Sequence, residues 1–308
     1  MPLDPQQKAV LDAFTALGNP RNETLPAAVA RANAARRLLI PGPDVAKVED
    51  RTIPGPDGGL PIRIFTPKED GPLPILMNFH GGGWVLGSVE ATDEVSRYLA
   101  NGAGCIVISV EYRLAPESKF PAAADDCYVA TVWASTNAAS FGGDANRLAV
   151  TGGSAGGNLA TVVALMARDR NGPRIVQQTL VYPAIEPDFT TKSYEENAEG
   201  YFLERETMKW YWDHYLRDSR DAADPYAVPI RAATLAGLPP ALVITAEYDP
   251  LRDEGETYAA ALSAAGVPTT CTRYDGVAHL FYQAPKQIDK GMEAIDETTA
   301  ALRTAFGT

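Results

Sequence analysis

A serine flanked by glycines stands where a short apolar run meets an Ala- and Leu-rich stretch. Residues 147–151 read RLAVT, the pentapeptide Gly152-Gly153-Ser154-Ala155-Gly156 follows, and residues 157–168 continue with helical composition. G-x-S-x-G in this setting is typical of a sharp strand-to-helix turn. Its strained backbone exposes the serine hydroxyl, and the glycines remove side chains that would clash. Ser154 is therefore a candidate nucleophile.

The alternative interpretation is a glycine-rich loop that only joins strand to helix or cradles a phosphate. No Lys follows these glycines as a phosphate-binding P-loop requires, and the spacing differs from the G-x-G-x-x-G of dinucleotide sites. The sequence favours the nucleophile.

A second glycine cluster follows the apolar run 73–79 and supports acyl chemistry. Attack on an ester carbonyl turns its oxygen into an anion, and each preorganised backbone N–H lowers the barrier by about 2.7–4 kcal/mol. We assign the N–H groups of Gly82, Gly83 and Ala155 as the donors of an oxyanion hole, because glycine lets the backbone approach closely. A plain turn is the alternative. The loop reads His80, Gly81, Gly82, Gly83 and Trp84.

A serine needs a base, and the chain contains three histidines. In hydrolases built on this turn the order is serine, acid, histidine, so the base should lie well after Ser154. His279 fits, in a loop after the predicted strand 269–274. His214 lies among aromatics in a predicted helix and is expected to pack there, and His80 is expected to orient the glycine loop.

The acid should end a strand between the serine and the histidine. The run ALVITAEYD ends in Asp249, which would accept a hydrogen bond from a ring nitrogen of His279. The competitors are less well placed. Asp253 falls in the next helix, Glu247 points to the other face of its strand, and Asp275 is too close in sequence to the histidine.

In these motifs the chain resembles the hormone-sensitive-lipase-like carboxylesterases of the α/β-hydrolase superfamily, the bacterial family IV. This resemblance implies the roles already assigned to the serine, the acid, the histidine and the three N–H donors. One departure is Gly153, where the nearest subgroup often has Asp. The matching motifs are HGGGW at 80–84, YRLAPE at 112–117, GGSAGGN at 152–158, DPLRDE at 249–254 and the G-x-x-H pattern at 276–279.

The elements that must position these residues alternate along the chain. They predict an α/β-hydrolase fold, a mostly parallel twisted sheet of about eight strands flanked by helices, with a small helical cap. Two strands around the turn 54–59 open the sheet in antiparallel fashion. The strand signals lie at 46–53, 61–66, 73–79, 105–112, 147–151, 179–184, 241–248 and 269–274, and the main helical signals at 125–138, 155–168, 254–265 and 286–305.

Two segments fall outside the alternation, and together they could form the cap. We expect residues 1–45 and 188–225 to belong to it, and residues 46–187 and 226–308 to form the catalytic core. Aromatic and apolar side chains here could line the acyl or alcohol pocket, although packing of cap on core explains them equally well. The pocket candidates are Trp84, which is the better one, and Tyr201, Phe202 and Leu203.

Charge and composition exclude several function classes. The formal net charge is −12, and basic runs interleaved with aromatics are lacking, so we expect no nucleic acid and no membrane as partner. The start MPLDPQQKAV lacks the apolar run of a signal peptide, which predicts a cytoplasmic protein. Cys105 and Cys271 fall in predicted strands and Cys127 lies apart, so we expect reduced core thiols and no metal site.

The expected reaction is hydrolysis of short- to medium-chain carboxylic esters through an acyl-enzyme on Ser154, with His279 as base and then acid and no cofactor. An amidase, a deacetylase or an acyltransferase could use the same residues. A non-catalytic small-molecule receptor is a further alternative, which the complete set of three residues disfavours. The strand 269–274 could lie at the sheet edge and pair across a two-fold axis, giving a homodimer.

Overall fold

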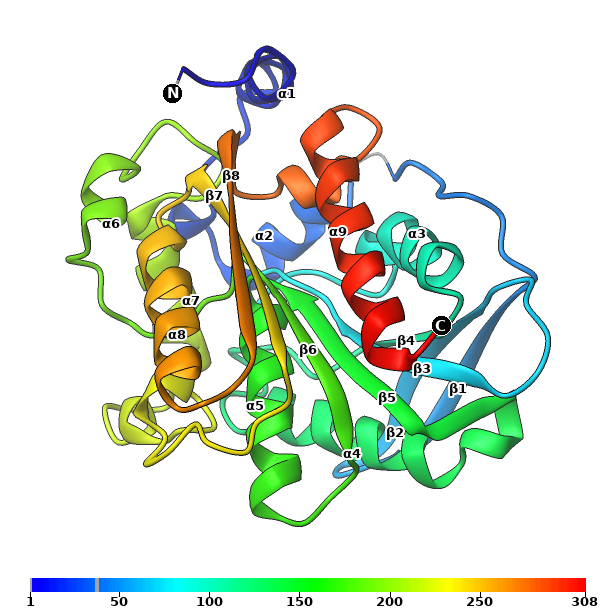
Figure 1. Cartoon of the computed structure of the whole chain (residues 1–308). Helices are drawn as coiled ribbons and strands as arrows, with labels where there is room; N and C mark the ends of the chain where they lie inside the picture. The colour runs from blue at the N-terminus through cyan, green and yellow to red at the C-terminus, as the bar shows by residue number, and fades with distance from the viewer. Residues whose placement is uncertain (1, 37–38) are drawn as a thin grey trace.

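The computed structural model describes residues 2–36 and 39–308, and its centre is an eight-stranded sheet (Figure 1). The strand order is β1-β2-β4-β3-β5-β6-β7-β8. The pairs β1–β2 and β2–β4 are antiparallel and the other neighbours are parallel, which confirms the predicted fold class. The strands are β1 (Lys47–Gly55), β2 (Gly58–Thr66), β3 (Leu73–Phe79), β4 (Ile106–Val110), β5 (Gly143–Gly153), β6 (Ile175–Val181), β7 (Ala241–Tyr248) and β8 (Thr269–Ala278).

The antiparallel opening is a tight hairpin. Gly55 pairs with Gly58, so Pro56 and Asp57 form the two-residue turn between β1 and β2. Gly58 has a φ of 108°, which a residue with a side chain rarely adopts. The turn residues expected from the sequence therefore set the register of this pair.

Helices cover both faces of the sheet, and the strands divide their apolar side chains between the two layers. Ile75 and Leu76 are neighbours in β3, yet Ile75 belongs to one apolar cluster and Leu76 to another, because successive strand residues point to opposite faces. The first cluster includes residues of α4 (Ala122–Thr136), α5 (Ala155–Asp169) and α8 (Arg252–Ala264), and the second includes residues of α3 (Asp93–Ala103) and α9 (Asp289–Phe306).

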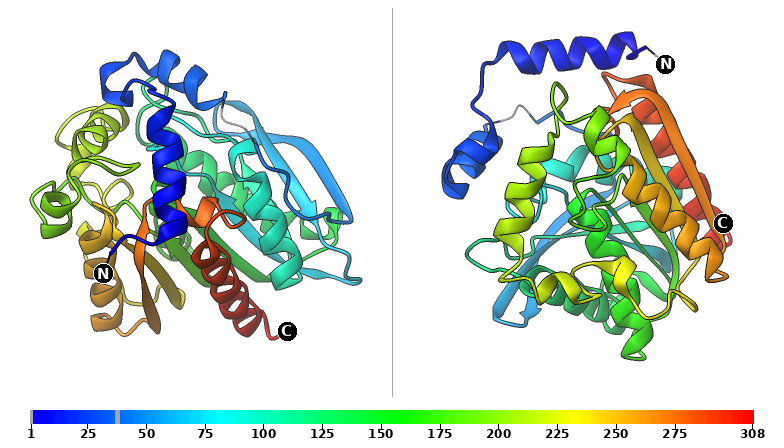
Figure 2. Two further views of the ribbon diagram at one scale, coloured as in Figure 1. Left: turned by 90° about the horizontal axis from the view of Figure 1, so that it is seen from above. Right: turned by 90° about the vertical axis from the view of Figure 1, so that its left-hand side faces the viewer.

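The remaining helices are α1 (Pro5–Ala16), α2 (Ala27–Ala34), α6 (Lys192–Glu196) and α7 (Arg205–Tyr215). Seen from above, α1 crosses the middle of the molecule (Figure 2, left). The amide of Asn22 donates to the hydroxyl of Tyr211 at 3.2 Å, and the rings of Phe14 and Phe202 meet edge to face with centroids 5.2 Å apart. Asn22 and Tyr211 are 189 positions apart in sequence, so two distant segments of the chain pack against each other.

Strand ends differ from the predicted ones by up to four residues, and two differences from the predicted elements have a clear cause. The strand expected at 179–184 is Ile175–Val181, because Tyr182 has a φ of 35° and cannot continue it. Helix α3 was not predicted, although Val95, Leu99 and Ala103 are buried at helical spacing. Its polar residues and Gly102 obscure that signal in a short segment.

One cysteine prediction is wrong. Cys105 and Cys127 are buried free thiols, but Cys271 is exposed. It lies in β8, which pairs with β7 on one side and ends the sheet on the other. An edge strand is covered less completely than a central one, and the edge position expected for residues 269–274 is confirmed.

Candidate active site

Four neighbouring parallel strands end beside one another, and a candidate residue follows each. Ser154 follows β5, Tyr182 follows β6, Asp249 follows β7 and His279 follows β8. The carboxyl ends of parallel strands meet at one edge of the sheet, where α/β proteins bind their ligands. The strand order therefore places residues up to 125 positions apart in sequence at one edge of the sheet, 279 − 154 = 125.

The turn at Ser154 has the strained geometry expected from its motif. Its backbone has φ 59° and ψ −122°, and it leads directly into α5. A side chain at Gly156 would overlap the carbonyl oxygen of Phe79, and one at Gly152 would overlap the backbone of Gly156. Helix α5 can therefore approach β3 only because both positions are glycine.

The serine is less open than the motif led us to expect. Ser154 is only 7% exposed, where an exposed hydroxyl was predicted. The glycine loop lies on it, since a Cβ built on Gly81 would be 3.5 Å from the Cβ of Ser154 and 2.9 Å from the carbonyl oxygen of Gly153. The loop after β3 and the turn after β5 thus form one packed unit.

The glycine loop turns sharply and touches α7. Gly82 and Gly83 have φ values of 118° and 59°, and the N–H of Leu86 donates to the carbonyl oxygen of Gly82 at 2.8 Å. A side chain at Gly83 would overlap the ring of Tyr211. Glycine at this position is required both by the backbone conformation and by the neighbouring helix.

His80 is buried and neutral at pH 7. Burial lowers the pKa of its imidazole to about 4. Nδ1 of the neutral ring donates its hydrogen to the carbonyl oxygen of Gly81 at 2.8 Å. The ring also stacks on that of Tyr112, with centroids 4.1 Å apart. The Tyr112 hydroxyl donates to the carbonyl oxygen of His80 at 2.7 Å. These contacts hold the start of the glycine loop.

Asp249 and His279 form a buried pair. The Nδ1 of His279 lies 2.6 Å from Oδ2 of Asp249, and the two residues are 3% and 0% exposed. The other oxygen, Oδ1, accepts the N–H of Leu251 at 2.9 Å. These two hydrogen bonds fix the carboxylate. Because the carboxylate accepts the hydrogen on Nδ1 of His279, a neutral ring has its lone pair at Nε2.

Two of the three competing acids are engaged elsewhere. Oε2 of Glu247 accepts the N–H of Gly276 at 2.6 Å, and Oδ2 of Asp253 accepts the N–H of Ser193 at 2.8 Å. Asp253 lies in the first turn of α8 as expected. Of the four carboxylates considered, Asp249 is the one that contacts the ring nitrogen of His279.

Tyr182 joins the histidine to the serine turn. Its ring centroid lies 4.4 Å from that of His279, and a Cβ built on Gly153 would be 3.1 Å from its ring. The N–H of Tyr182 donates to the carbonyl oxygen of Ile244 in β7. This tyrosine therefore fills the space between the ends of β5, β7 and β8, and sequence reasoning missed it because nothing in its local pattern is distinctive.

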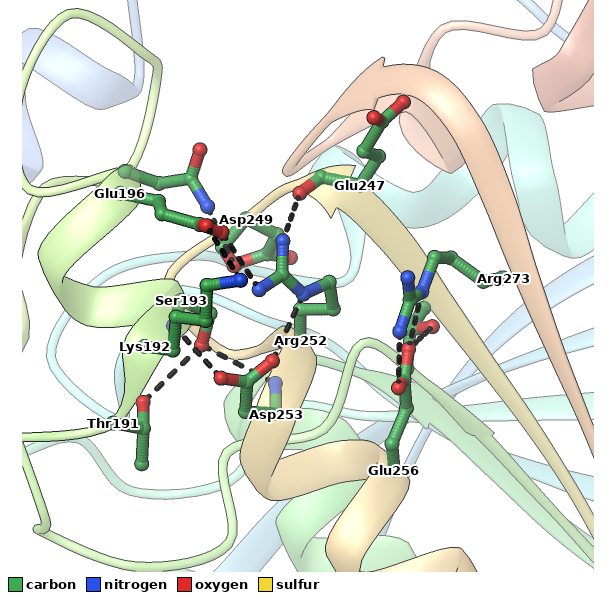
Figure 3. A network of polar contacts seen from close by, with 12 residues as sticks. Thr191, Lys192, Ser193, Glu196, Glu247, Asp249, Arg252, Asp253, Glu256 and Arg273 are labelled. Atoms are coloured by element: carbon green, nitrogen blue, oxygen red, sulfur yellow. Dashed lines mark hydrogen bonds and ion pairs between the residues drawn. The ribbon is translucent and has the colours of Figure 1, made fainter. Parts of the chain in front are cut away.

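A polar network holds the loop that carries Asp249 (Figure 3). Arg252 donates to the carbonyl oxygen of Glu247 at 3.0 Å and to the carboxylate of Glu196 at 2.9 Å. The hydroxyl of Ser193 donates to the carbonyl oxygen of Pro250 at 2.7 Å. Helix α6 is thus tied to the start of α8. Arg252 is part of the motif DPLRDE, and its charge within that motif is the signal by which the sequence could have identified it.

Glu254 is a second residue that the sequence reasoning missed. It is buried, and Oε1 accepts the N–H of Ile185 at 2.8 Å. Burial and the neighbouring carboxylate of Asp249 raise the pKa of Glu254 well above its usual value. The next N–H along, that of Ala184, donates to the carbonyl oxygen of Ser154 at 3.2 Å. Glu254 therefore braces the loop that touches the serine turn.

The pocket candidates lie between core and outer helices. Trp84 is fully buried and stacks on Tyr215 of α7, with centroids 4.2 Å apart. Tyr201 packs on Tyr248, the residue before Asp249, at 5.2 Å. Phe202 contacts Phe14 of α1 as described, Leu203 is buried, and His214 bonds through Nδ1 to the carbonyl oxygen of Trp210 within α7 as expected for a packed helix residue.

Comparison with known proteins identifies the class that this fold and site define. The model of a family with the alpha/beta hydrolase fold matches residues 76–283. An arylesterase of Saccharolobus solfataricus is 43% identical over 257 residues, which cover 83% of this chain and 84% of the relative. Carboxylesterase NlhH of Mycobacterium tuberculosis is 39% identical over 314 residues, 99% of this chain and 96% of the relative.

A solved structure agrees over the whole chain. The ester-hydrolase EH1AB1 from the metagenome of Lake Arreo has 41% identity and a TM-score of 0.94, and the match covers 99% of this chain and 100% of that one. The chain therefore belongs to the α/β-hydrolase family, within its hormone-sensitive-lipase-like carboxylesterases, which confirms the resemblance drawn from the motifs. Over the described residues, we find no helix with the length and apolarity to cross a membrane.

Proposed function

We propose that this protein is a serine carboxylesterase in which Ser154 is the nucleophile, His279 the base and Asp249 the residue that orients it. The observation that carries the proposal is the buried hydrogen bond of 2.6 Å between His279 and Asp249, at the sheet edge where the strained Ser154 turn also lies. The names of the relatives, arylesterase and carboxylesterase, support an ester as substrate.

The reaction proceeds through an acyl-enzyme. Nε2 of His279 takes the proton of the Ser154 hydroxyl as the oxygen attacks the ester carbonyl. The imidazolium then gives that proton to the leaving alcohol as the C–O bond breaks. Water repeats the sequence on the acyl-enzyme, releases the acid and restores the serine. Asp249 stabilises the imidazolium and keeps the Nδ1–H tautomer, so Nε2 faces the reaction.

The tetrahedral intermediate carries an oxyanion, and we assign its donors to the backbone N–H groups of Gly82, Gly83 and Ala155. Ala155 is the first residue of α5, where the helix dipole adds positive potential. The packing of Gly81 against Ser154 supports the assignment, because it brings the glycine loop to the nucleophile. His80 contributes by holding that loop and stays neutral at pH 7.

We assign residues 1–45 and 188–225 to a cap over residues 46–187 and 226–308, with Met1, Arg37 and Leu38 lying outside the described residues. The contacts of Asn22 with Tyr211 and of Phe14 with Phe202 support a single unit made of both segments. A small cap favours short to medium acyl chains. Each methylene buried in the acyl pocket adds about 0.8 kcal/mol until the pocket ends.

The test is a series of p-nitrophenyl esters with acyl chains from two to sixteen carbons. We expect a rate maximum at short chains, and loss by roughly 10⁶-fold in Ser154→Ala. Ser263→Ala, at an exposed serine of α8, should keep wild-type rates and serves as the matched control. Emulsified long-chain triglycerides turned over as fast as short esters would refute the chain-length assignment.

A labelled fluorophosphonate separates the remaining outcomes. Labelling of wild type but not Ser154→Ala, without turnover of any ester, would indicate a live serine with another substrate class, such as an amide or an acetylated small molecule. Neither labelling nor turnover would favour a small-molecule receptor.

We also assign β8 as a pairing surface for a second copy of the chain. It ends the described sheet, and all of its first seven residues, Thr269–Asp275, are exposed or half-buried. Antiparallel pairing across a two-fold axis would satisfy its open backbone groups. Light scattering should then give twice the mass of 32.9 kDa, and a substitution Thr270→Pro should lower it to the monomer value. A monomeric wild type would remove this assignment alone.

A further inference from the structure

The first turn of α1 has the residue types of a capping box, Asp4 and Gln7, but both residues also bond to another segment of the chain. Asp4 is the N-cap, and its Oδ1 accepts the N–H groups of Gln6 and Gln7 at 2.9 and 3.4 Å. In a capping box, the Gln at the third helical position returns to the N–H of the cap residue. Gln7 occupies that position.

Here the side-chain amide of Gln7 does not return to the N–H of Asp4, because both groups bond to the segment before His279 instead. The N–H of Asp4 donates to the carbonyl oxygen of Gly276 at 2.8 Å. Oε1 of Gln7 accepts the N–H of Ala278 at 3.0 Å, a contact between residues 271 positions apart. Ala278 is the last residue of β8 and immediately precedes the histidine.

The contact is enclosed. Gln7 and Ala278 are both 0% exposed, so water cannot replace the amide oxygen if it is lost. A buried N–H without an acceptor is costly, and a shift of the peptide is the way to relieve it. A shift at Ala278 moves the next residue, His279.

The same segment is held from its other side by β7. Oε2 of Glu247 accepts the N–H of Gly276 at 2.6 Å, and Ala278 pairs with Tyr248 in the ladder. Gly276 has a φ of 76°, and a Cβ there would lie 3.4 Å from the nitrogen of Asp4. Helix α1 therefore supports this segment in addition to the sheet.

We propose that Gln7 is a positioning residue for His279. Its amide oxygen fixes the Ala278 peptide and thereby the direction in which the imidazole faces Ser154. This role rests on the proposed function, in which His279 is the base. It also gives α1 a part in catalysis that is separate from covering the site.

The test compares Gln7→Met, which keeps the length of the side chain and removes the amide, with Gln6→Met. Gln6 is the matched control, because its Oε1 also accepts a backbone N–H, that of Asp289 at 2.9 Å, but at the start of α9. We expect Gln7→Met to lower kcat on a short p-nitrophenyl ester about tenfold or more with KM unchanged, since misplacement of a catalytic group affects the chemical step. Gln6→Met should keep wild-type kcat.

Gln7→Glu provides a second variant that preserves an acceptor. It should restore most of the kcat lost in Gln7→Met. Where its carboxyl group is ionised, it should also move the acid limb of the pH–rate profile to higher pH, because a nearby negative charge favours the imidazolium. A glutamine that only stabilises the fold would leave kcat of folded Gln7→Met at the wild-type value.

The proposal is overturned if Gln7→Met keeps wild-type kcat, if it raises KM alone, or if Gln6→Met loses as much activity. Should Gln7→Met not fold, as judged by its circular dichroism, a low kcat in folded Gln7→Glu would overturn it as well. A wild type without esterase activity would instead refute the proposed function, and this role with it.

Discussion

The carboxylate of Asp249 lies 2.6 Å from Nδ1 of His279, although the two residues are 30 positions apart in sequence, with the whole of α8 and β8 between them. Both side chains are buried, so the pair is shielded from competing water. A carboxylate in this position selects one tautomer of the ring and stabilises its charged form.

Asp249→Asn should lower kcat about 10⁴-fold, because an amide can donate to the ring and favour the wrong tautomer. The measurement is steady-state hydrolysis of a short p-nitrophenyl ester. Asp253→Asn is the control, since that carboxylate bonds to Ser193 instead. It should lose far less activity, and equal losses in the two variants would contradict the assignment of the acid.

Gly83→Ala should abolish activity and cost several kcal/mol of stability. Its φ of 59° is strained for alanine, and the new methyl would overlap the ring of Tyr211. Gly266→Ala separates the two effects, because Gly266 has a φ of 79° and open space around its Cβ position. That control should cost only about 1 kcal/mol in urea unfolding. Similar costs at both positions would show that the contact with α7 is unimportant.

His80 should make the fold less stable as the pH falls. Burial lowers the pKa of its imidazole from 6.5 to about 4, so the unfolded chain takes up the proton first. The stability from this group is therefore full above pH 6.5 and is lost between about pH 6.5 and 4, in total of the order of 3 kcal/mol.

The measurement is the free energy of unfolding in urea at several pH values for wild type and His80→Gln. Other titrating groups cancel in the difference between the two curves. The variant should be less sensitive to pH across this window, and parallel curves would show that His80 does not titrate as described.

Glu254 should act in the opposite direction. Its pKa is raised by burial and by the carboxylate of Asp249, so the folded chain keeps a proton that the unfolded chain releases above its ordinary value of 4.5. The associated stability is present below pH 4.5 and is lost as the pH rises. Glu254→Gln is a neutral acceptor for the N–H of Ile185 and avoids this loss.

The melting temperatures of wild type and Glu254→Gln at pH 5 and pH 8 test this. The variant should gain relative to wild type on going to pH 8. The exposed Glu195→Gln carries the same change in charge and controls for net charge. An equal response of both variants would contradict the assignment.

Much of the site could be predicted because its chemistry uses local motifs. The glycines around Ser154 are needed by one turn, and the loop at 80–84 is needed by another, so each can be read from a few adjacent residues. Asp249 could be chosen because it ends an apolar run that predicts a strand. The carboxyl ends of parallel strands meet at one edge of the sheet, so the end of a strand in the sequence also predicts a position in the fold.

Other features depend on which elements become neighbours. Tyr182 and Gln7 have no distinctive local pattern for their contacts, and the motif DPLRDE, which Glu254 ends, does not reveal the contact of Glu254 with Ile185. The exposure of Cys271 depends on β8 ending the described sheet.

The sequence by itself therefore determined the α/β order, the strained turn at Ser154, the glycine loop and the candidates for the acid and the base, because short-range sterics and hydrophobic periodicity act within a few residues. Only the tertiary structure decided how deeply the serine is buried, which helix touches Gly83, and that the first turn of α1 holds the segment before His279. Those outcomes arise from close packing and from pairing of buried polar groups between distant segments, which no local pattern encodes.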